Sequence, residues 1–201
     1  MTEIGQKLSW MMYVVQFNMH YVLTIIAALW IIQCVNFALG YRLNAFGILP
    51  RSPSGLLGIL LAPLLHGNFS HLLFNSIPLF LLMNLILLTG MPEFIIVTLL
   101  ITIISGFCVW LLGRKALHVG ASGVIMGYWG YLMINAILYP SIITVLLVIF
   151  CFYYFAGLFA SLMPKAGTSW ESHVFGFVSG LLVSYAHLPS YFLLWIAYTS
   201  H

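Results

Sequence analysis

Residues 120–139 read GASGVIMGYWGYLMINAILY, a serine between glycines followed by an apolar run without a single charged residue. A segment of this length approaches the roughly 20 residues that a helix needs to cross about 30 Å of hydrocarbon. A hydroxyl in hydrocarbon costs free energy unless it is partnered, and glycines allow another backbone to come close. The stretch therefore predicts a membrane-spanning helix, and it makes Ser122 a candidate functional residue.

Composition extends this prediction to the whole chain. Hydrophobic residues make up 63% of the 201 residues and charged residues only 4%. The surface of a soluble fold of this size needs about a quarter or more charged residues. Aspartate is absent, and the net charge of +3 is too small for a nucleic-acid-binding surface. We therefore expect an integral, multi-pass protein that contacts the lipid bilayer and has no nucleic-acid partner.

Long apolar runs divide the chain into six predicted membrane helices. They cover residues 20–39, 71–89, 93–112, 122–139, 141–163 and 172–188. The breaks between them are mostly rich in glycine, proline or charge, which is typical of connecting segments. The first connection, 41–70, holds an apolar segment at 55–65 that is too short to span and fits an interfacial or re-entrant position. The sequence predicts an all-α membrane protein, a six-transmembrane-helix bundle with a single domain over residues 1–201.

Successive membrane helices run in opposite directions across the bilayer. The N-terminal ends of the second, fourth and sixth predicted helices therefore lie on one side of the membrane. Polar residues gather at these three ends. His66 and His71 lie at the second helix, Ser122 at the fourth and His173 at the sixth. Ionisable groups within a membrane are costly and normally mark a function. We therefore expect these four side chains to converge at one depth.

Ser122 and His173 are a candidate nucleophile and general base. A serine hydroxyl is a weak nucleophile until an adjacent imidazole accepts its proton. Gly176 and Gly180 share a helix face with His173, and a glycine ridge begins at Gly123 beside the serine. Two such ridges let helix backbones approach more closely than usual. The glycines therefore predict that Ser122 and His173 can touch.

A third partner for the histidine is nearly excluded by counting. With aspartate absent, the acidic residues are Glu3, Glu93 and Glu171. Glu3 is terminal, and Glu93 opens the third helix on the opposite side of the membrane. Glu171 precedes His173 by two residues, which turns it about 200° away on a helix. The sequence therefore predicts a catalytic dyad.

Two further polar residues have the spacing of an oxyanion site. His71 and Asn75 stand at i and i+4, which aims an imidazole and an amide in one direction. Both groups can donate hydrogen bonds to a developing oxyanion. The backbone N–H of Ser122, at a helix N-terminus, would complete the site.

These residues resemble the motifs of the rhomboid intramembrane serine proteases. HGNFSHLLFN at 66–75 resembles the family's H-x4-H-x3-N, GASG at 120–123 its G-x-S-G, and HVFGFVSG at 173–180 its H-x2-G-x3-G. The resemblance covers nearly the whole chain and implies the compact, bacterial-type, six-helix core of that family. It also implies an endopeptidase that cleaves transmembrane protein substrates near the extracytoplasmic interface through an acyl-enzyme, without a cofactor or a metal.

The resemblance implies a role for each site residue. Ser122 is the nucleophile, His173 the general base, His71 and Asn75 oxyanion donors, and His66, Gly120, Gly123, Gly176 and Gly180 structural residues near the site. Where some members carry a tyrosine that stacks on the catalytic histidine, this chain has Met126, whose thioether can pack on an imidazole. Many members also carry a Trp-Arg pair in the first loop, whereas the loop of this chain has no tryptophan.

The topology of the family implies a bacterial inner membrane protein with its N-terminus in the cytoplasm. The distribution of lysine and arginine alone favours the reverse orientation. In the family topology only Lys7 lies inside, and the basic residues outside are Arg42, Arg51, Arg114, Lys115 and Lys165. The sequence leaves the orientation open, together with the oligomeric state and the natural substrate.

Two other classes of protein also stay open. His66, His71 and His173 could ligate a metal or haem, although acidic partners for such ligands are scarce and H-E-x-x-H is absent. A rhomboid-like pseudoprotease could bind membrane clients without cutting them, although it would need neither Ser122 nor His173. For the remaining histidines we expect structural roles. These are His20, His118, His187 and His201.

Overall fold

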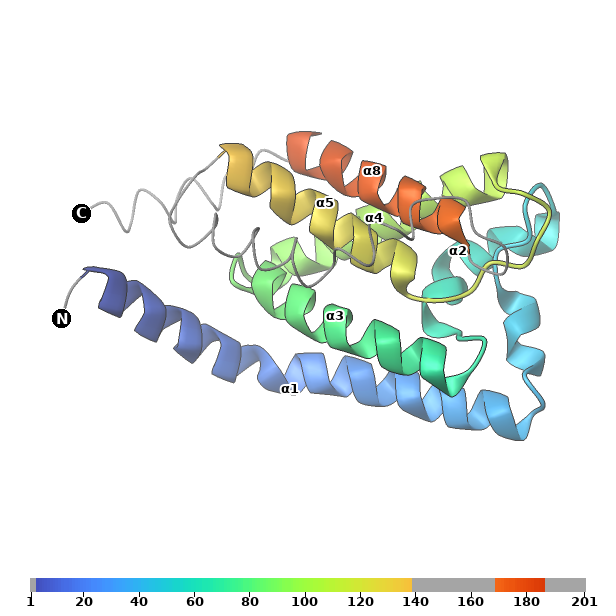
Figure 1. Ribbon diagram of the computed structural model, residues 1–201, viewed down its shortest axis with the longest axis horizontal. Helices are drawn as coiled ribbons and strands as arrows, with labels where there is room; N and C mark the ends of the chain where they lie inside the picture. Colours follow the sequence, from blue (N-terminus) through green and yellow to red (C-terminus); the bar gives the residue numbers. More distant parts are fainter. Residues whose placement is uncertain (1–2, 139–168, 187–201) are drawn as a thin grey trace.

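The computed structural model describes residues 3–138 and 169–186, which form a bundle of helices (Figure 1). The long helices are α1 (Glu3–Ala38), α3 (Phe69–Leu87), α4 (Met91–Leu112), α5 (Ser122–Leu138) and α8 (Trp170–Ala186). Within this part of the chain there is no strand, and the extended backbone forms one isolated bridge, between Ile48 and His118. The chain is therefore an all-α membrane protein, and this prediction from the sequence is confirmed.

The main difference from the predicted helix bounds is at α1. This helix begins at Glu3 rather than at residue 20. The prediction followed hydrophobicity, and the polar residues before position 20 interrupt the apolar run. They do not interrupt the helix, because the segment 6–19 contains neither glycine nor proline. The other described helices begin within two residues of their predicted starts, and α3 and α4 also end within two residues of their predicted ends. The predicted helix ends at residues 139 and 188 and the predicted helix 141–163 lie outside the described residues.

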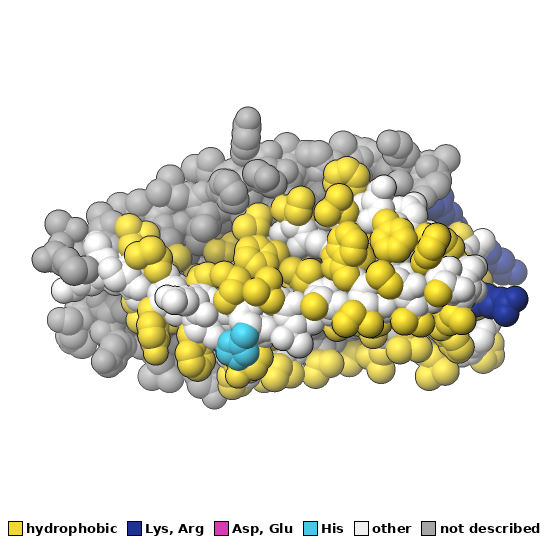
Figure 2. Space-filling model, turned by 90° about the horizontal axis from the view of Figure 1, so that it is seen from below, with side chains coloured by type: hydrophobic (Ala, Val, Ile, Leu, Met, Phe, Trp, Pro, Cys, Tyr) yellow, Lys and Arg dark blue, Asp and Glu magenta, His cyan; other side chains and the backbone are white. Residues whose placement is uncertain are grey.

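The described helices have the length and the surface of a membrane protein. Three are long and apolar enough to cross a bilayer, namely Leu8–Ala38, Phe69–Leu87 and Met91–Leu112. The described parts of α5 and α8 span 17 residues each, which is at the short end of the range for a transmembrane helix. Hydrophobic side chains cover most of the described surface in Figure 2, and basic side chains lie at one end. This surface suits a hydrocarbon environment.

The segment that was predicted to be interfacial, 55–65, consists of short helical turns. They are the 3-10 helices η2 (Pro53–Leu56) and η3 (Ala62–Leu64) and the short helix α2 (Gly58–Leu61), preceded by η1 (Arg42–Phe46). These turns pack on α4, where a Cβ on Gly106 would lie 2.7 Å from Cγ2 of Ile59. Leu57 and Leu60 are exposed on the other side. The turns therefore present one face to the bundle and an apolar face outward.

Two side chains fasten this first loop to the end of α4. The indole Nε1 of Trp110 donates to the carbonyl of Ser52 at 2.8 Å. Arg51 Nη1 donates to the carbonyls of Leu111 at 3.1 Å and Gly113 at 2.8 Å. The last carbonyls of a helix have no partner within the helix, so Arg51 acts as their cap. The loop of this chain lacks a tryptophan of its own, and Trp110 of α4 holds it instead.

α5 lies at the centre of the bundle, and its first ten residues are all buried. Its closest neighbour is α8. A Cβ on Gly176 would overlap the carbonyl of Gly123, and one on Gly180 would overlap the carbonyl of Gly127. The backbones of the two helices are thus in direct contact. The glycine ridges that the sequence indicated face each other across this contact.

A second group of buried polar residues lies away from the start of α5. Glu93, in the first turn of α4, accepts a hydrogen bond from the hydroxyl of Tyr131 at 2.7 Å. Asn135 Nδ2 donates to Ser184 Oγ of α8 at 3.0 Å. α4 runs in the opposite direction to α3 and α5 in Figure 1, so Glu93 lies at the opposite end of the bundle from Ser122. These bonds join the distant ends of α4, α5 and α8.

Candidate active site

The N-terminal ends of α3, α5 and α8 lie at the same end of the bundle (Figure 1). His71 is in the first turn of α3, Ser122 is the first residue of α5, and His173 is in the first turn of α8. Ser122 is 6% exposed and His173 9% exposed. The fold therefore encloses both polar side chains at one end of the bundle.

Gly120 brings the start of α5 against α3. Its φ is +122°, a conformation that residues with a side chain rarely adopt. A Cβ at this position would lie 2.7 Å from Cε1 and 2.9 Å from Nε2 of His71, and 3.6 Å from Nδ2 of Asn75. Glycine is therefore needed here for both its backbone and its size. The imidazole of His71 and the amide of Asn75 thus both lie beside Gly120, which precedes Ser122 by two residues.

His66 joins the first loop to the start of α5. Its side chain is fully buried, and its Nε2 accepts a hydrogen bond from the backbone N–H of Ala121 at 3.4 Å. The ring meets that of His71 edge to face, with the centroids 5.2 Å apart. Asn68 caps α3 by accepting from the N–H of His71 at 2.7 Å. Because Nε2 of His66 accepts a hydrogen bond, the neutral His66 ring carries its proton on Nδ1.

Burial, together with the nearby charge of His71, lowers the pKa of His66 from 6.5 to about 4. The unfolded chain therefore binds more protons than the folded one between these two pH values. We predict that the free energy of unfolding in detergent falls by about 3 kcal/mol as the pH drops through this interval. The control is His66→Gln, whose amide oxygen can accept the same hydrogen bond without titrating. Parallel pH profiles of thermal unfolding for the two proteins would contradict this prediction.

The first turn of α8 lies on the start of α5. A Cβ on Gly123 would lie 3.3 Å from the carbonyl oxygen of Ser172, which is tighter than most contacts. These two residues are the chain neighbours of Ser122 and His173. His173 also lies within electrostatic range of His71. The structure thus brings the predicted site residues of three helices together at one place.

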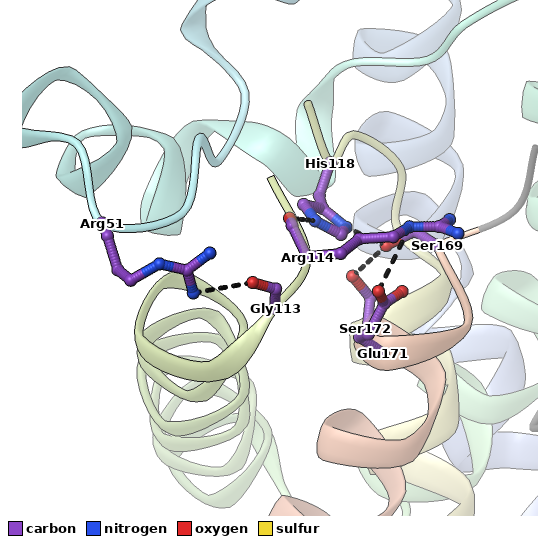
Figure 3. Close-up of polar contacts among 7 residues, drawn as sticks. All are labelled: Arg51, Gly113, Arg114, His118, Ser169, Glu171 and Ser172. Atoms are coloured by element: carbon purple, nitrogen blue, oxygen red, sulfur yellow. Dashed lines mark hydrogen bonds and ion pairs between the residues drawn. The ribbon is translucent and has the colours of Figure 1, made fainter. Parts of the chain in front are cut away.

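The carboxylate of Glu171 forms an ion pair with the loop before α5. Its Oε1 pairs with Nε of Arg114 at 3.2 Å, and its side chain is only 6% exposed (Figure 3). Arg114 comes from the loop between α4 and α5, so this ion pair joins that loop to α8. The prediction that Glu171 points away from His173 agrees with this pairing. Arg51 and Arg114 both use their charges to hold the loops in place.

The family model described as Rhomboid domain matches residues 53–190. The chain belongs to the rhomboid family. An uncharacterized protein of Mycobacterium tuberculosis is 32% identical over 174 residues, which are 82% of this rhomboid and 72% of the relative. An uncharacterized protein of Mycobacterium leprae is 31% identical over 194 residues, 92% of this chain and 75% of the relative. Rhomboids are generally intramembrane serine proteases, and some members are pseudoproteases.

The amide of Asn75 offers an unpartnered donor at the site of this rhomboid. The Nδ2 atom of Asn75 is buried and makes no hydrogen bond to any described residue. A buried donor without an acceptor costs free energy, so such a group calls for an explanation. It lies beside Gly120, which precedes Ser122 by two residues in the chain. The amide is therefore available to a group that enters the site.

The described part of this rhomboid shows no arrangement of three or more His, Cys, Asp or Glu side chains that could hold a metal ion. His66, one of the candidate ligands, uses its Nε2 to accept from Ala121. Met126, four residues after Ser122, is fully buried in the core. His20 is exposed on α1, whereas His187 and His201 lie outside the described residues.

Sequence reasoning missed the polar residues around the first turn of α8. His118 was expected to be structural, and Ser169 and Ser172 were not singled out. All three are joined by hydrogen bonds (Figure 3). No spacing rule connects residues that are 51 positions apart, so no signal in a single sequence could have found this set.

Proposed function

We propose that this rhomboid is an intramembrane serine endopeptidase with Ser122 as nucleophile and His173 as general base. The observation that carries the proposal is the unpartnered, buried Nδ2 of Asn75, held beside the backbone that leads into Ser122. A client-binding module has no need of such a donor next to a buried serine. An enzyme that forms an oxyanion needs one.

The proposed reaction begins when Ser122 Oγ attacks the carbonyl carbon of the scissile peptide while His173 accepts the hydroxyl proton. The carbonyl oxygen becomes an oxyanion, which accepts hydrogen bonds from Asn75, His71 and the N–H of Ser122. The C–N bond then breaks as His173 gives its proton to the leaving amine. A water molecule, deprotonated by the same imidazole, hydrolyses the acyl-enzyme and regenerates the serine.

The substrates we propose are transmembrane proteins cut near the extracytoplasmic side. Attack requires an extended backbone, whereas every backbone group of a transmembrane helix is already bonded within the helix. A substrate with glycine, proline or polar residues near the interface would unwind more easily there. The proposal places the protein in a bacterial inner membrane with its N-terminus in the cytoplasm, as a single domain over residues 1–201.

We predict that Asn75→Ala lowers kcat by roughly 10²-fold to 10³-fold and changes KM little, because the lost hydrogen bond forms only as the oxyanion develops. The measurement is the steady-state cleavage of a transmembrane substrate in detergent. Asn84→Ala is the matched control, since Asn84 is a buried asparagine on the same helix that donates to the carbonyl of Phe80. An equal loss of kcat in both variants would contradict the oxyanion role.

Covalent labelling with a fluorophosphonate tests the proposed function. These reagents phosphonylate a serine that an adjacent base activates, so we expect one adduct on Ser122, located by peptide mass spectrometry. A pseudoprotease or a histidine-ligated metal protein would leave Ser122 unmodified. Such an unmodified Ser122 in folded wild-type protein would overturn the proposal.

A further inference from the structure

A chain of hydrogen bonds links the loop before α5 to the first turn of α8 (Figure 3). His118 is 2% exposed. Its Nδ1 lies 2.5 Å from Ser169 Oγ, which lies 2.6 Å from Ser172 Oγ. Its Nε2 lies 3.2 Å from the carbonyl oxygen of Arg114. The imidazole therefore uses both nitrogens to join two segments that are distant in the sequence.

Elementary chemistry fixes the direction of these bonds when the ring is neutral. A carbonyl oxygen only accepts, so Nε2 of His118 carries the proton and donates to Arg114. Nδ1 is then an acceptor, and the hydroxyl of Ser169 must donate to it. Ser169 has no second proton, so the hydroxyl of Ser172 donates to Ser169 Oγ. Each donor in the chain therefore has one defined acceptor.

The series of hydrogen bonds starts at His118, whose backbone is held in place. The backbone of His118 exchanges two hydrogen bonds with Ile48 of the first loop, at 2.9 and 3.0 Å. The ion pair between Arg114 and Glu171 spans the same two segments. The backbone of His118 is thus held from both sides, and its side chain can in turn hold the start of α8.

The series of hydrogen bonds ends at Ser172, beside the proposed dyad. Ser172 is the residue before His173, and its carbonyl oxygen lies against Gly123, the residue after Ser122. The N–H of Ser172 also donates to the carbonyl of Ser169 at 3.0 Å, which closes the first turn of α8. A shift of Ser172 would therefore move His173 relative to Ser122.

We propose that His118 is a positioning residue, which acts through Ser169 and Ser172 to set the place of His173 against Ser122. The inference rests on the proposed function. No proton passes along this chain to the substrate, because its last member, Ser172, donates toward His118 and away from the site. The role is geometric, and small displacements of reacting groups have large effects on rate.

The test uses His118→Phe, which fills the space without a nitrogen, and His118→Asn, whose Oδ1 can accept from Ser169. We expect His118→Phe to lower both kcat and the rate of fluorophosphonate labelling of Ser122 by roughly 10-fold to 100-fold, with KM little changed. We expect His118→Asn to recover most of this loss. The control is Ser184→Ala, which removes a buried hydroxyl from the far end of the same helix.

Wild-type labelling rates in His118→Phe would overturn the positioning role. So would a loss of rate that Ser184→Ala reproduces at the same loss of thermal stability, since that result belongs to a purely structural residue. If His118→Phe does not fold, Ser169→Ala interrupts the same series of hydrogen bonds with a smaller change in the side chain. The same fall in rate is expected.

A second measurement does not depend on activity. Hydrogen exchange at the amides of residues 170–173 should be faster in His118→Phe than in the wild type, because the first turn of α8 loses its anchor. Unchanged exchange there would overturn the inference even if the enzyme is active. Faster exchange in a protein whose Ser122 is never labelled would instead overturn the proposed function and leave the anchor itself in place.

Discussion

His173→Ala is expected to lower the rate of substrate cleavage by roughly 10⁴-fold to 10⁶-fold. Without an imidazole nearby, the Ser122 hydroxyl keeps its proton and is a poor nucleophile. Glu171 cannot take over as the base, because its carboxylate is paired with Arg114. The residual rate would come from the oxyanion donors and substrate binding alone. The measurement is single-turnover cleavage of a transmembrane substrate at saturating enzyme.

The matched control for this variant is His20→Ala. His20 is an exposed histidine of α1, and its ring contacts those of Phe17 and Tyr21. His20→Ala also removes an imidazole group, but one that lies at a distance from the site. We therefore expect a cleavage rate close to that of the wild type. Comparable activity in His173→Ala and His20→Ala would contradict the assignment of the general base.

Gly176→Ala is expected to lower both stability and activity. The new Cβ would overlap the carbonyl of Gly123, which is backbone and cannot rotate away. α5 and α8 must therefore separate, at a cost of about 1–3 kcal/mol for overpacking. A displacement of 1 Å in a reacting group can cost roughly 10²-fold in rate. We expect a lower melting temperature and a fall in kcat of that size or more.

The control for the glycine variant is Val178→Ala, two residues further along α8, where the side chain is exposed. This substitution also leaves an alanine on α8, but on its exposed face, away from the contact with α5. We expect near wild-type stability and activity. The account of the helix contact is wrong if Gly176→Ala melts and cleaves like Val178→Ala.

The sequence predicted the parts of this rhomboid that follow from periodicity and short spacing. Apolar runs located the described membrane helices, and the glycines at 176 and 180 indicated the close contact of α8 with α5. The spacing of His71 and Asn75 placed both side chains on one face of α3. These features are local, so a few neighbouring residues determine them.

The start of α1 and the fastening of the first loop could not be predicted in the same way. Residues 3–19 form helix without being continuously apolar, so hydrophobicity alone set the start too late. Trp110 and Ser52 are 58 residues apart, and Arg51 reaches carbonyls at 111 and 113. Contacts across such separations arise from the packing of whole helices, and no local pattern records them.

The loop contacts also bear on the charge distribution. Arg51 bonds to backbone carbonyls and Arg114 pairs with Glu171. The positive-inside rule counts lysine and arginine residues in the short loops near the ends of membrane helices, whatever else these residues do. Two of the basic residues that favoured the reverse orientation nevertheless have a structural reason to be in their loops, which is compatible with the proposed orientation with a cytoplasmic N-terminus.

We propose that Ser122 cuts peptide bonds of membrane-embedded substrates. The most direct test of this proposal places purified wild type and Ser122→Ala in liposomes with a transmembrane substrate and identifies the fragments by mass spectrometry. We predict two defined fragments with the wild type and an intact substrate with Ser122→Ala over the same time. Cleavage at the same bond by Ser122→Ala, at a rate near that of the wild type, would contradict the account.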